Sequence, residues 1–550
     1  MVAYPQHRPA TLALHNMVAY PQHRPATLAL HGMVAAPHSL AAQAGLDLLK
    51  AGGNALDAAI AANATLQVVF PHLLGLGGDL FVLMYHARDR QLYALNASGR
   101  APMAATIERY AALGYTTMPA FGIHSVTVPG CADGWEMAAE RFGRLGLARA
   151  LAPAIAYAES GFPVGPALHT ALTRMSALPH THRSWRDNFL PTGTIPAIGT
   201  VAHAPALART LRLLAERGAS EFYRGELAER IAAFFAQEGG LITGEDLAAH
   251  RGEWVTPLAV PFGDLQVYEL PPNTQGVTAL QMLGISAAHA LGETPLAPDT
   301  VHVAVEAKKL AFADRAAYLT DPAHMRVDPA ALIAPDYLRA RSALIDPRRA
   351  GPSIAPAAHA GDTVYLCAAD EEGNAVSLIQ SNYRGFGSGY VVDGTGIVLQ
   401  NRGAYFSLDA AAANALAPGK RTLHTLIPSL ALRAGRPAMI FGSMGGDGQP
   451  QTHLQVYTAV VRYGLNIQAA IELPRWFHSA KEPEGDEVLW MEDRFPPETL
   501  AELAARGHTI TALGPWDNLM GHAQGILLDA STGVLQGGAD PRAEGAAVGW

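Results

Sequence analysis

The sequence predicts an α/β protein in two parts, a helix-rich first part and a second part that opens on β-strands. Two patterns indicate the helices: an Ala- and Leu-rich stretch over residues 39–69 and an apolar period over residues 301–319. A third observation marks the second part, because short β-type runs separated by Gly-containing turns begin after residue 362.

The elements of the first part follow from their local patterns. A helix from Ser39 ends at Gly52-Gly53, and a second one covers residues 55–69. We expect a strand over 80–85, a second at QLYAL (91–95), helical segments over 134–160 and 205–236, and an amphipathic helix over 301–319.

A Pro-, Gly- and Ala-rich segment without periodicity, residues 346–362, separates the two parts and reads as a flexible, exposed linker. The strands expected after it are TVYLCAAD (363–370), NAVSLIQSNY (374–383) and GIVLQN (396–401).

Charge and composition exclude several classes of function. The 39 Lys and Arg against 48 Asp and Glu, a net charge of −9, argue against a nucleic-acid partner. No apolar run approaches the length of a membrane helix, and the N-terminus lacks the apolar stretch of a signal peptide, so we expect a cytoplasmic protein without membrane contact. Cys131 and Cys367 form no CxxC motif and are expected to be buried free thiols rather than a disulfide.

One internal repeat is present, because residues 1–15 (MVAYPQHRPATLALH) recur as residues 17–31. A single duplication is too short for a repeat architecture. We therefore expect residues 1–31 to lie outside the fold.

The chemistry can be narrowed by the motifs that the sequence lacks. HExxH, GxxxxGK[ST] and GxSxG are all missing, and we expect neither a metal nor an organic cofactor. Thr363 is the remaining candidate nucleophile, since it follows the linker and opens a strand. If the peptide bond before it were cut, its α-amine, with a pKa of about 7.7–8.0, would be available as a general base.

Seven segments spread over the chain carry a family resemblance: residues 32–63 (GMVAAPHSLAAQAGLDLLKAGGNALDAAIAAN), 71–81 (PHLLGLGGDLF), 125–135 (SVTVPGCADGW), 306–322 (EAKKLAFADRAAYLTDP), 442–451 (GSMGGDGQPQ), 463–476 (YGLNIQAAIELPRW) and 540–542 (DPR). Together they resemble the γ-glutamyltranspeptidase family, from about Gly32 to Gly549.

This resemblance implies an N-terminal nucleophile hydrolase, an αββα sandwich made as a precursor that cuts itself between Asp362 and Thr363. It implies a large subunit over 32–362 and a small subunit over 363–550. The family's nucleophile lies ten residues before the Gly of a GNAV turn, which is Gly373 here, and this again indicates Thr363. The resemblance also implies that Ser381 positions the nucleophile and that Gly445 and Gly446 hold the oxyanion.

The substrate pocket departs from the family members that act on glutathione. Ser98 stands where the family has its carboxylate-binding Arg, with Arg100 two places later. The paired serines correspond to His424 and Thr425, the ammonium-binding Asp to Tyr405, and an Asn to Tyr383. Arg384 and Arg402 follow the nucleophile and suit a carboxylate. This pattern is similar to the branch of cephalosporin acylases and oxamate amidohydrolase.

The sequence thus predicts a self-processing amidohydrolase, with acyl transfer as a further activity, that acts on an amide of a small carboxylate-bearing molecule of oxamate or glutaryl type. The expected partners are this small molecule and the chain's own two subunits, with a dimer of that heterodimer as a further option. Two alternatives stay open: a γ-glutamyltransferase or glutathione hydrolase, and an uncleaved, catalytically silent homologue that serves as a binding protein.

Overall fold

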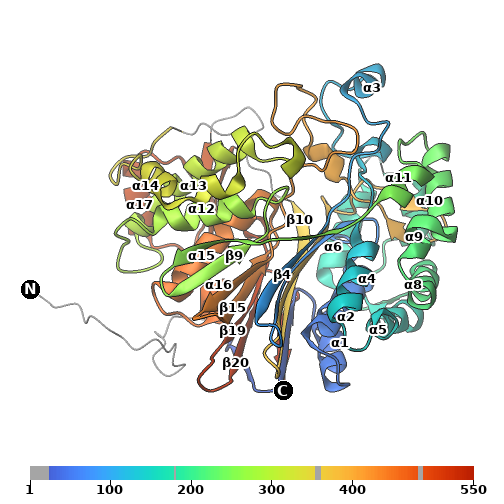
Figure 1. The fold of residues 1–550 in the computed structure, drawn as a ribbon, viewed down its shortest axis with the longest axis horizontal. Helices are drawn as coiled ribbons and strands as arrows, with labels where there is room; N and C mark the ends of the chain where they lie inside the picture. The colour runs from blue at the N-terminus through green and yellow to red at the C-terminus, as the bar shows by residue number, and fades with distance from the viewer. Residues whose placement is uncertain (1–23, 179–180, 353–360, 481–486) are drawn as a thin grey trace, which may run out of the picture.

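Two stacked β-sheets form the centre of the molecule (Figure 1). The computed structural model describes residues 24–178, 181–352, 361–480 and 487–550. The first seven-stranded sheet has the order β21 (Ala546–Gly549), β2 (Gly32–Ala36), β10 (Asp362–Asp370), β11 (Ala375–Tyr383), β3 (Asp79–His86), β4 (Gln91–Ala97) and β7 (Glu253–Val255). The second has the order β1 (Thr27–Ala29), β20 (Leu535–Ala539), β19 (Ala523–Leu528), β15 (Arg436–Ser443), β14 (Ser429–Arg433), β9 (Leu265–Glu269) and β8 (Leu258–Phe262).

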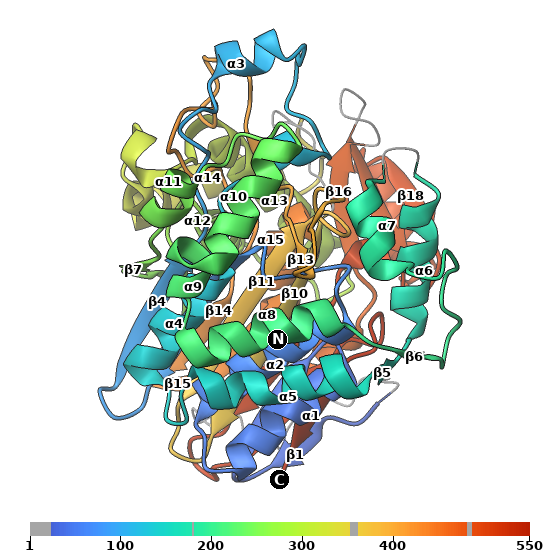
Figure 2. The same ribbon diagram turned by 90° about the vertical axis from the view of Figure 1, so that its right-hand side faces the viewer.

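Helices cover the outer face of each sheet. Those on the side of the first sheet are α1 (Ser39–Lys50), α2 (Ala55–Val69), α4 (Cys131–Phe142), α5 (Leu147–Ser160), α6 (Pro166–Ser176), α7 (Arg183–Phe189), α8 (Pro205–Arg217), α9 (Ser220–Arg224) and α10 (Glu226–Gln237). Those on the side of the second are α12 (Gly276–Ser286), α13 (Pro298–Tyr318), α14 (Pro335–Ser342), α15 (Gln449–Val461), α16 (Ile467–Glu472) and α17 (Pro497–Ala505). Figure 2 shows α1, α2, α5 and α8 in front of the first sheet. The αββα sandwich is confirmed.

The remaining described α-helices and strands are smaller. They are α3 (Ile107–Ala112), α11 (Gly244–Ala249), a sheet of β16 (Trp476–Ala480), β17 (Glu487–Glu492) and β18 (Ile510–Leu513), and the pairs β5 (Phe162–Pro163) with β6 (Val201–Ala202) and β12 (Val391–Val392) with β13 (Ile397–Val398).

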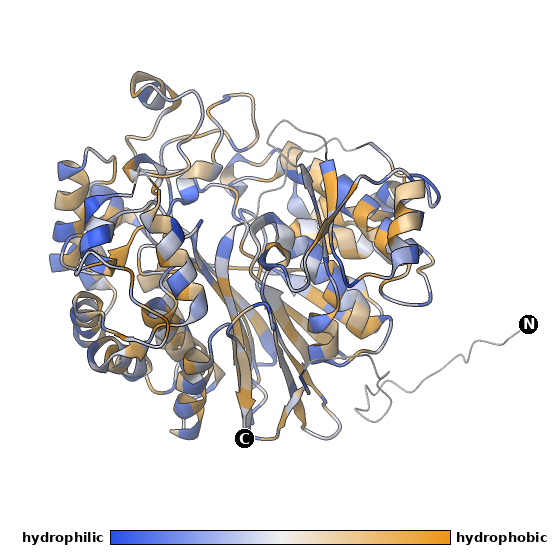
Figure 3. Cartoon of the chain, turned by 180° about the vertical axis from the view of Figure 1, so that it is seen from behind, coloured by the Kyte–Doolittle hydropathy of each residue, from blue (hydrophilic) through white to orange (hydrophobic). Residues whose placement is uncertain are grey.

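The alternation of side chains along β10 shows how the layers are built. Val364 and Leu366 point to the helix layer, whereas Tyr365 and Cys367 point between the two sheets. Both sets are apolar because both faces of the strand are buried, as in a strand at the centre of a sandwich. Figure 3 shows hydrophobic residues along the strands and on the helices that pack on them.

Most predicted elements of the first part are confirmed, with two differences in detail. The segments 134–160 and 205–236 are each broken, the first into α4 and α5, the second into α8, α9 and α10. The breaks fall where the glycines at 143, 146, 218 and 225 stand, and Gly146 and Gly218 have positive φ values of 76° and 76°.

The helix α13 is not amphipathic in the way the sequence predicts. Its polar residues His302, Glu306, Lys308 and Lys309 are buried along with its apolar ones. They are tolerated because each has a polar partner, for example the ammonium of Lys309 at 2.7 Å from the Glu306 carboxylate. The apolar period therefore located the helix but did not predict which of its faces is buried.

The expectation that residues 1–31 lie outside the fold is wrong for their last part. Thr27–Ala29 pair with Leu535–Gly537 at the edge of the second sheet, and Arg24 donates to the Gly545 carbonyl at 3.1 Å. Most of the duplicated segment, residues 1–23, lies outside the described residues, as do residues 353–360 of the predicted linker. Cys131 and Cys367 are buried free thiols, as predicted. Among the described residues, no helix is both long and apolar enough to span a membrane.

Candidate active site

Thr363 lies at the start of β10, in the middle of the first sheet, where the pairing with β11 shifts its register between residues 362 and 364. Its side chain is 1% exposed. A register shift of this kind bends a strand locally and can re-aim a side chain. The predicted nucleophile is therefore placed at an irregular strand end, enclosed by protein.

Ser381, on β11, links Thr363 to the peptide bond that precedes it. The Thr363 hydroxyl donates to Ser381 Oγ at 3.2 Å, and Ser381 Oγ donates to the Asp362 carbonyl oxygen at 2.6 Å. The backbone N–H of Tyr383 donates to Ser381 Oγ at 2.7 Å and fixes that oxygen from a third side. The hydroxyls thus form a short chain from the threonine side chain to the carbonyl group before it.

The Gly445-Gly446 pair lies against this peptide segment. A Cβ atom added to Gly361 would come 3.3 Å from the Cα of Gly446 and 3.4 Å from the Tyr383 ring. Gly445 and Gly446 have φ values of 136° and 55°, in the left-handed region that favours glycine. Such a turn can direct successive backbone N–H groups to one side, as an oxyanion site requires.

A buried network that the sequence analysis missed supports this glycine turn. Gln275 Nε2 donates to the Gly446 carbonyl at 2.9 Å, and its Oε1 accepts from Arg315 at 2.6 Å. The same Arg315 nitrogen lies 2.5 Å from Asp447 Oδ1, which also accepts from the Tyr405 hydroxyl at 2.6 Å. Burial alone would lower the pKa of Arg315, but Asp447, Tyr405 and Tyr383 together outweigh burial and raise that pKa.

Tyr405 is therefore bonded to a protein residue and not to a substrate group. Its hydroxyl is engaged with Asp447, and burial raises the pKa of that hydroxyl well above its usual value. Both Arg315 and Asp447 fall in motifs quoted above for the family resemblance. The motifs therefore pointed to Arg315 and Asp447, but they gave neither residue a role in the site.

Two arginines flank the Tyr383 ring. The Arg402 guanidinium lies 4.3 Å from the ring centre and the Arg384 guanidinium 5.1 Å from it. Arg402 is 1% exposed and donates to Thr425 Oγ1 at 3.0 Å, while its Nε and Nη2 atoms have no hydrogen-bond partner among the described residues. Burial lowers the pKa of Arg402. A buried guanidinium with unused donors is suited to an anionic ligand.

Both ring nitrogens of His424 are hydrogen-bonded within the protein. Its Nε2 donates to Asp79 Oδ2 at 3.0 Å, and its Nδ1 accepts from the Leu426 N–H at 3.4 Å. Burial lowers the pKa of His424 to about 4, so the imidazole is neutral at pH 7. Of the two residues that replace the paired serines, Thr425 is the one in contact with Arg402.

Arg100 is not brought into this cluster by any described contact. Its guanidinium donates to Glu253 at 2.9 Å, to Asp321 at 3.3 Å and to the Gly419 carbonyl at 3.2 Å. The buried Ser98 hydroxyl donates to Asn96 at 2.7 Å. These contacts account for both side chains as parts of the scaffold.

A backbone donor was also missed by the sequence analysis. The N–H of Gly385 donates to the carboxylate of Asp362 at 2.7 Å. Burial raises the pKa of this carboxyl group, and the Gly385 N–H together with Arg174 and Arg384 offsets part of that effect. The residue before Thr363 is thus bound by its carbonyl and by its side chain.

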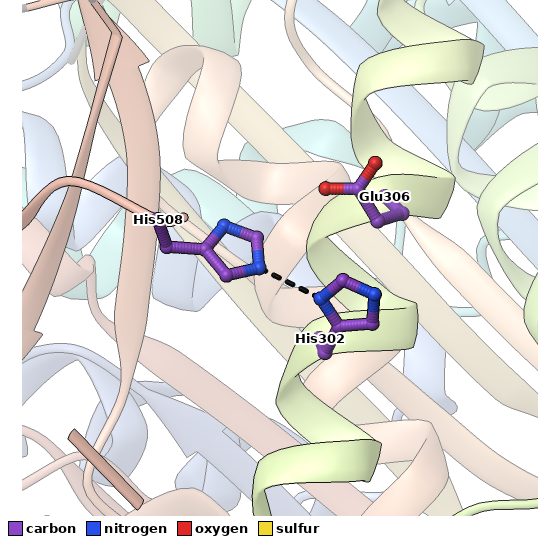
Figure 4. Close-up of side chains that lie close together, drawn as sticks. All are labelled: His302, Glu306 and His508. Atoms are coloured by element: carbon purple, nitrogen blue, oxygen red, sulfur yellow. Dashed lines mark hydrogen bonds between the residues drawn. The ribbon is translucent and has the colours of Figure 1, made fainter. Parts of the chain in front are cut away.

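A separate polar cluster lies on α13, where His302 and Glu306 are one turn apart and His508 approaches from the C-terminal part (Figure 4). His302 Nδ1 and His508 Nε2 are 2.8 Å apart, and His302 Nε2 donates to the Asp346 carbonyl at 2.8 Å. Burial, with Lys309 and His302, lowers the pKa of His508 to about 3. Since Lys309 already neutralises Glu306, a metal ion would have to compete with its ammonium group.

An αββα sandwich with a threonine at the start of a central strand, hydrogen-bonded to a serine and preceded by a segment that lies against a glycine turn, defines an amide hydrolase of the N-terminal nucleophile type. Comparison with known proteins makes this more specific. The model of the family "Gamma-glutamyltranspeptidase" matches residues 41–550, and the chain belongs to this family.

Two curated relatives and one solved structure are similar over nearly the whole chain. The chain is 41% identical to the glutathione hydrolase-like YwrD proenzyme of Bacillus subtilis (strain 168) and 42% identical to the oxamate amidohydrolase proenzyme of Klebsiella pneumoniae subsp. pneumoniae; each match covers 93% of this chain and 97% of the relative. The crystal structure of cephalosporin acylase from Bacillus halodurans matches with a TM-score of 0.90 and 43% identity, over 100% of this chain and 99% of that one. The predicted branch of the family is confirmed.

Proposed function

We propose that this chain is a self-processing amidohydrolase that cuts itself between Asp362 and Thr363 and then hydrolyses amides of small carboxylate-bearing molecules through an acyl-Thr363 intermediate. The observation that carries the proposal is the chain of hydroxyls from Thr363 through Ser381 to the Asp362 carbonyl oxygen. The "proenzyme" names of both curated relatives support a precursor that matures into two subunits.

In self-cleavage, Thr363 Oγ attacks the carbonyl carbon of Asp362. Its proton passes to Ser381 Oγ while the Ser381 proton passes to the carbonyl oxygen, along hydrogen bonds that are already in place. The C–N bond then breaks, the proton on the former carbonyl oxygen moves to the Thr363 nitrogen, which becomes the free α-amine, and Asp362 is left as an ester on Oγ. Water hydrolyses this ester, which frees the Thr363 hydroxyl and leaves Asp362 with a C-terminal carboxylate.

In turnover, the free α-amine takes the proton from Thr363 Oγ as the oxygen attacks the substrate amide, and passes it to the leaving nitrogen. The N–H groups of Gly445 and Gly446 hold the oxyanion, which is worth about 2.7–4 kcal/mol per donor in related chemistry. Water, activated by the same amine, then releases the acyl group as a carboxylic acid. The network of Gln275, Arg315 and Asp447 keeps the glycine turn in place.

Recognition of a carboxylate is assigned to Arg402. Its guanidinium is buried beside Tyr383, and two of its nitrogens have no hydrogen-bond partner among the described residues. A carboxylate there would satisfy both donors and would itself be compensated on leaving water. Arg384 is the second candidate, whereas the ion pairs of Arg100 argue against that residue.

The γ-glutamyl alternative is less well supported. A γ-glutamyl group carries an α-ammonium, which needs an acidic partner when it is buried. In this cluster the Asp447 carboxylate is already bonded to Arg315 and Tyr405, and the position of the family's ammonium-binding Asp is occupied by Tyr405 itself.

The test uses the mature enzyme and pairs of substrates of equal size, with and without a carboxylate, starting from oxamate and a glutaryl amide. Arg402→Gln is expected to lower kcat/KM for the acid substrate by about 10- to 100-fold and to change the neutral amide far less, as for one lost charged hydrogen bond. Arg433→Gln is the matched control, because Arg433 pairs with Asp264 on the surface at 2.7 Å. Equal losses on both substrates would show that Arg402 is structural, and a chain that never cleaves would favour the silent binding homologue.

A further inference from the structure

The precursor presents its own acyl group to Thr363, and that group carries a carboxylate. In self-cleavage the acyl group transferred to Oγ is residue Asp362. Its carbonyl oxygen is held by Ser381 at 2.6 Å and its carboxylate by the Gly385 N–H at 2.7 Å. The two contacts fix both ends of a four-carbon unit whose carboxylate carbon is three bonds from the reacting carbonyl carbon.

The geometry points to a carboxylate subsite, formed by the Gly385 N–H and the neighbouring Arg384, that Asp362 fills before cleavage and a substrate acyl group fills afterwards; the preferred substrate is then an amide with succinamate spacing. This inference rests on the proposed function and makes it more specific: it places the acyl carboxylate beside Arg384, the second candidate named above, in place of Arg402. It selects a chain length between the oxamate and glutaryl types that the sequence suggested.

Three arguments support a single binding position for the Asp362 acyl group and the substrate acyl group. Self-cleavage and turnover form an ester on the same Thr363 Oγ, so the acyl carbonyl carbon must come to the same atom in both. The segment before Thr363 lies against the glycine turn, since an added Cβ on Gly361 would be 3.3 Å from Gly446 Cα. Once Asp362 departs, the Gly385 N–H loses an acceptor that it now holds at 2.7 Å.

The charged groups around this subsite suit an anion. The Nε of Arg384 is buried and has no hydrogen-bond partner among the described residues, and the Arg384 guanidinium packs 5.1 Å from the Tyr383 ring centre. Burial raises the pKa of the Asp362 carboxyl group, and the Gly385 N–H, Arg174 and Arg384 offset part of that effect by favouring the charged form. Arg384 is close enough to attract a carboxylate while Gly385 gives it direction.

The first experiment measures kcat/KM of the mature enzyme for the monoamides oxamate, malonamate, succinamate and glutaramate, with butyramide as the neutral analogue of succinamate. Succinamate is expected to exceed oxamate and glutaramate by about tenfold or more, the effect of one charge-assisted hydrogen bond that the other lengths cannot make. Arg384→Gln should remove this advantage and leave butyramide nearly unchanged, and Arg433→Gln should keep it.

The second experiment uses the precursor and does not depend on any substrate. Asp362→Asn and Asp362→Glu should each slow self-cleavage by about tenfold, since one removes the charge and the other misplaces it. Thr363→Ala, which stays uncut, gives the thermal unfolding of the folded precursor for comparison. Wild-type cleavage rates in both Asp362 variants, or a preference for oxamate or glutaramate, would overturn the subsite. Preference for oxamate or glutaramate would leave the proposed carboxylate amidohydrolase standing, whereas hydrolysis of butyramide alone would refute both.

Discussion

Replacing Ser381 by alanine tests the self-cleavage geometry most directly. The change removes the donor that lies 2.6 Å from the Asp362 carbonyl oxygen and the acceptor that receives the Thr363 hydroxyl at 3.2 Å. Losing one donor to a developing oxyanion costs about 2.7–4 kcal/mol, which corresponds to a rate that is about 100 to 1,000 times slower. Ser381→Thr keeps the hydroxyl and should cleave at a rate close to that of the wild type.

The assay follows freshly made precursor over time on a denaturing gel and by intact mass, where the products should contain 362 and 188 residues, the latter being 550 − 362. Ser377→Ala is the matched control, because this buried serine lies on the same strand and bonds Tyr365 at 2.8 Å instead. Both alanine variants are also compared by chemical unfolding in the Thr363→Ala background. A folded Ser381→Ala chain that cleaves as fast as Ser377→Ala would refute the reasoning.

Three further outcomes are expected. The mature enzyme should turn over γ-glutamyl anilides and glutathione several orders of magnitude less well than good family members. The resemblance implies that its pocket lacks two or three charged hydrogen bonds, each worth about 1.5–3 kcal/mol. Comparable efficiency in a steady-state assay would contradict this. Gly445→Ala should lower kcat by about tenfold or more at nearly unchanged KM, since a φ of 136° strains any residue with a Cβ and moves the oxyanion donors. The free energy of unfolding should fall as the pH is lowered from 6.5 towards 4. The buried imidazoles of His424, His453 and His508 have pKa values of about 4, 3 and 3, so the unfolded chain binds more protons than the folded chain in this pH range. Each imidazole contributes up to about 1.4 kcal/mol per pH unit, and a flat urea-unfolding profile over this range would exclude the effect.

The sequence predicted the layers and the strand on which the candidate nucleophile lies because both depend on local patterns. The run of strand-forming residues in β10 and the change of composition at residue 362 are visible without a structure, and Thr363 lies where they meet. The extent of burial was not predictable in the same way. Lys308 is 0% exposed within α13, and only the fold brings His478 to 3.1 Å from its ammonium.

The candidate pocket was predicted less completely than the nucleophile. Position along the chain suggested Arg100 and His424 as substrate contacts, but Glu253 and Asp79, which are distant in sequence, engage them. Gln275 and the Gly385 N–H were missed for the same reason, since a backbone donor and an amide side chain give no signal until their partners are placed. Tertiary contacts therefore decide which of several polar residues remain available.

The order of the strands determines how the two fragments are held together after the proposed cut. Within the described part of the chain, five strand pairs join residues on opposite sides of the proposed cut: β2 with β21, β2 with β10, β3 with β11, β1 with β20 and β9 with β14. Neither fragment could complete a sheet alone, so the chain must fold before it is cut, and the two pieces should remain together without any covalent link. Breaking one peptide bond then exposes a reactive amine while both sheets keep their strand pairing. Reassociation of the two fragments would not re-form that peptide bond.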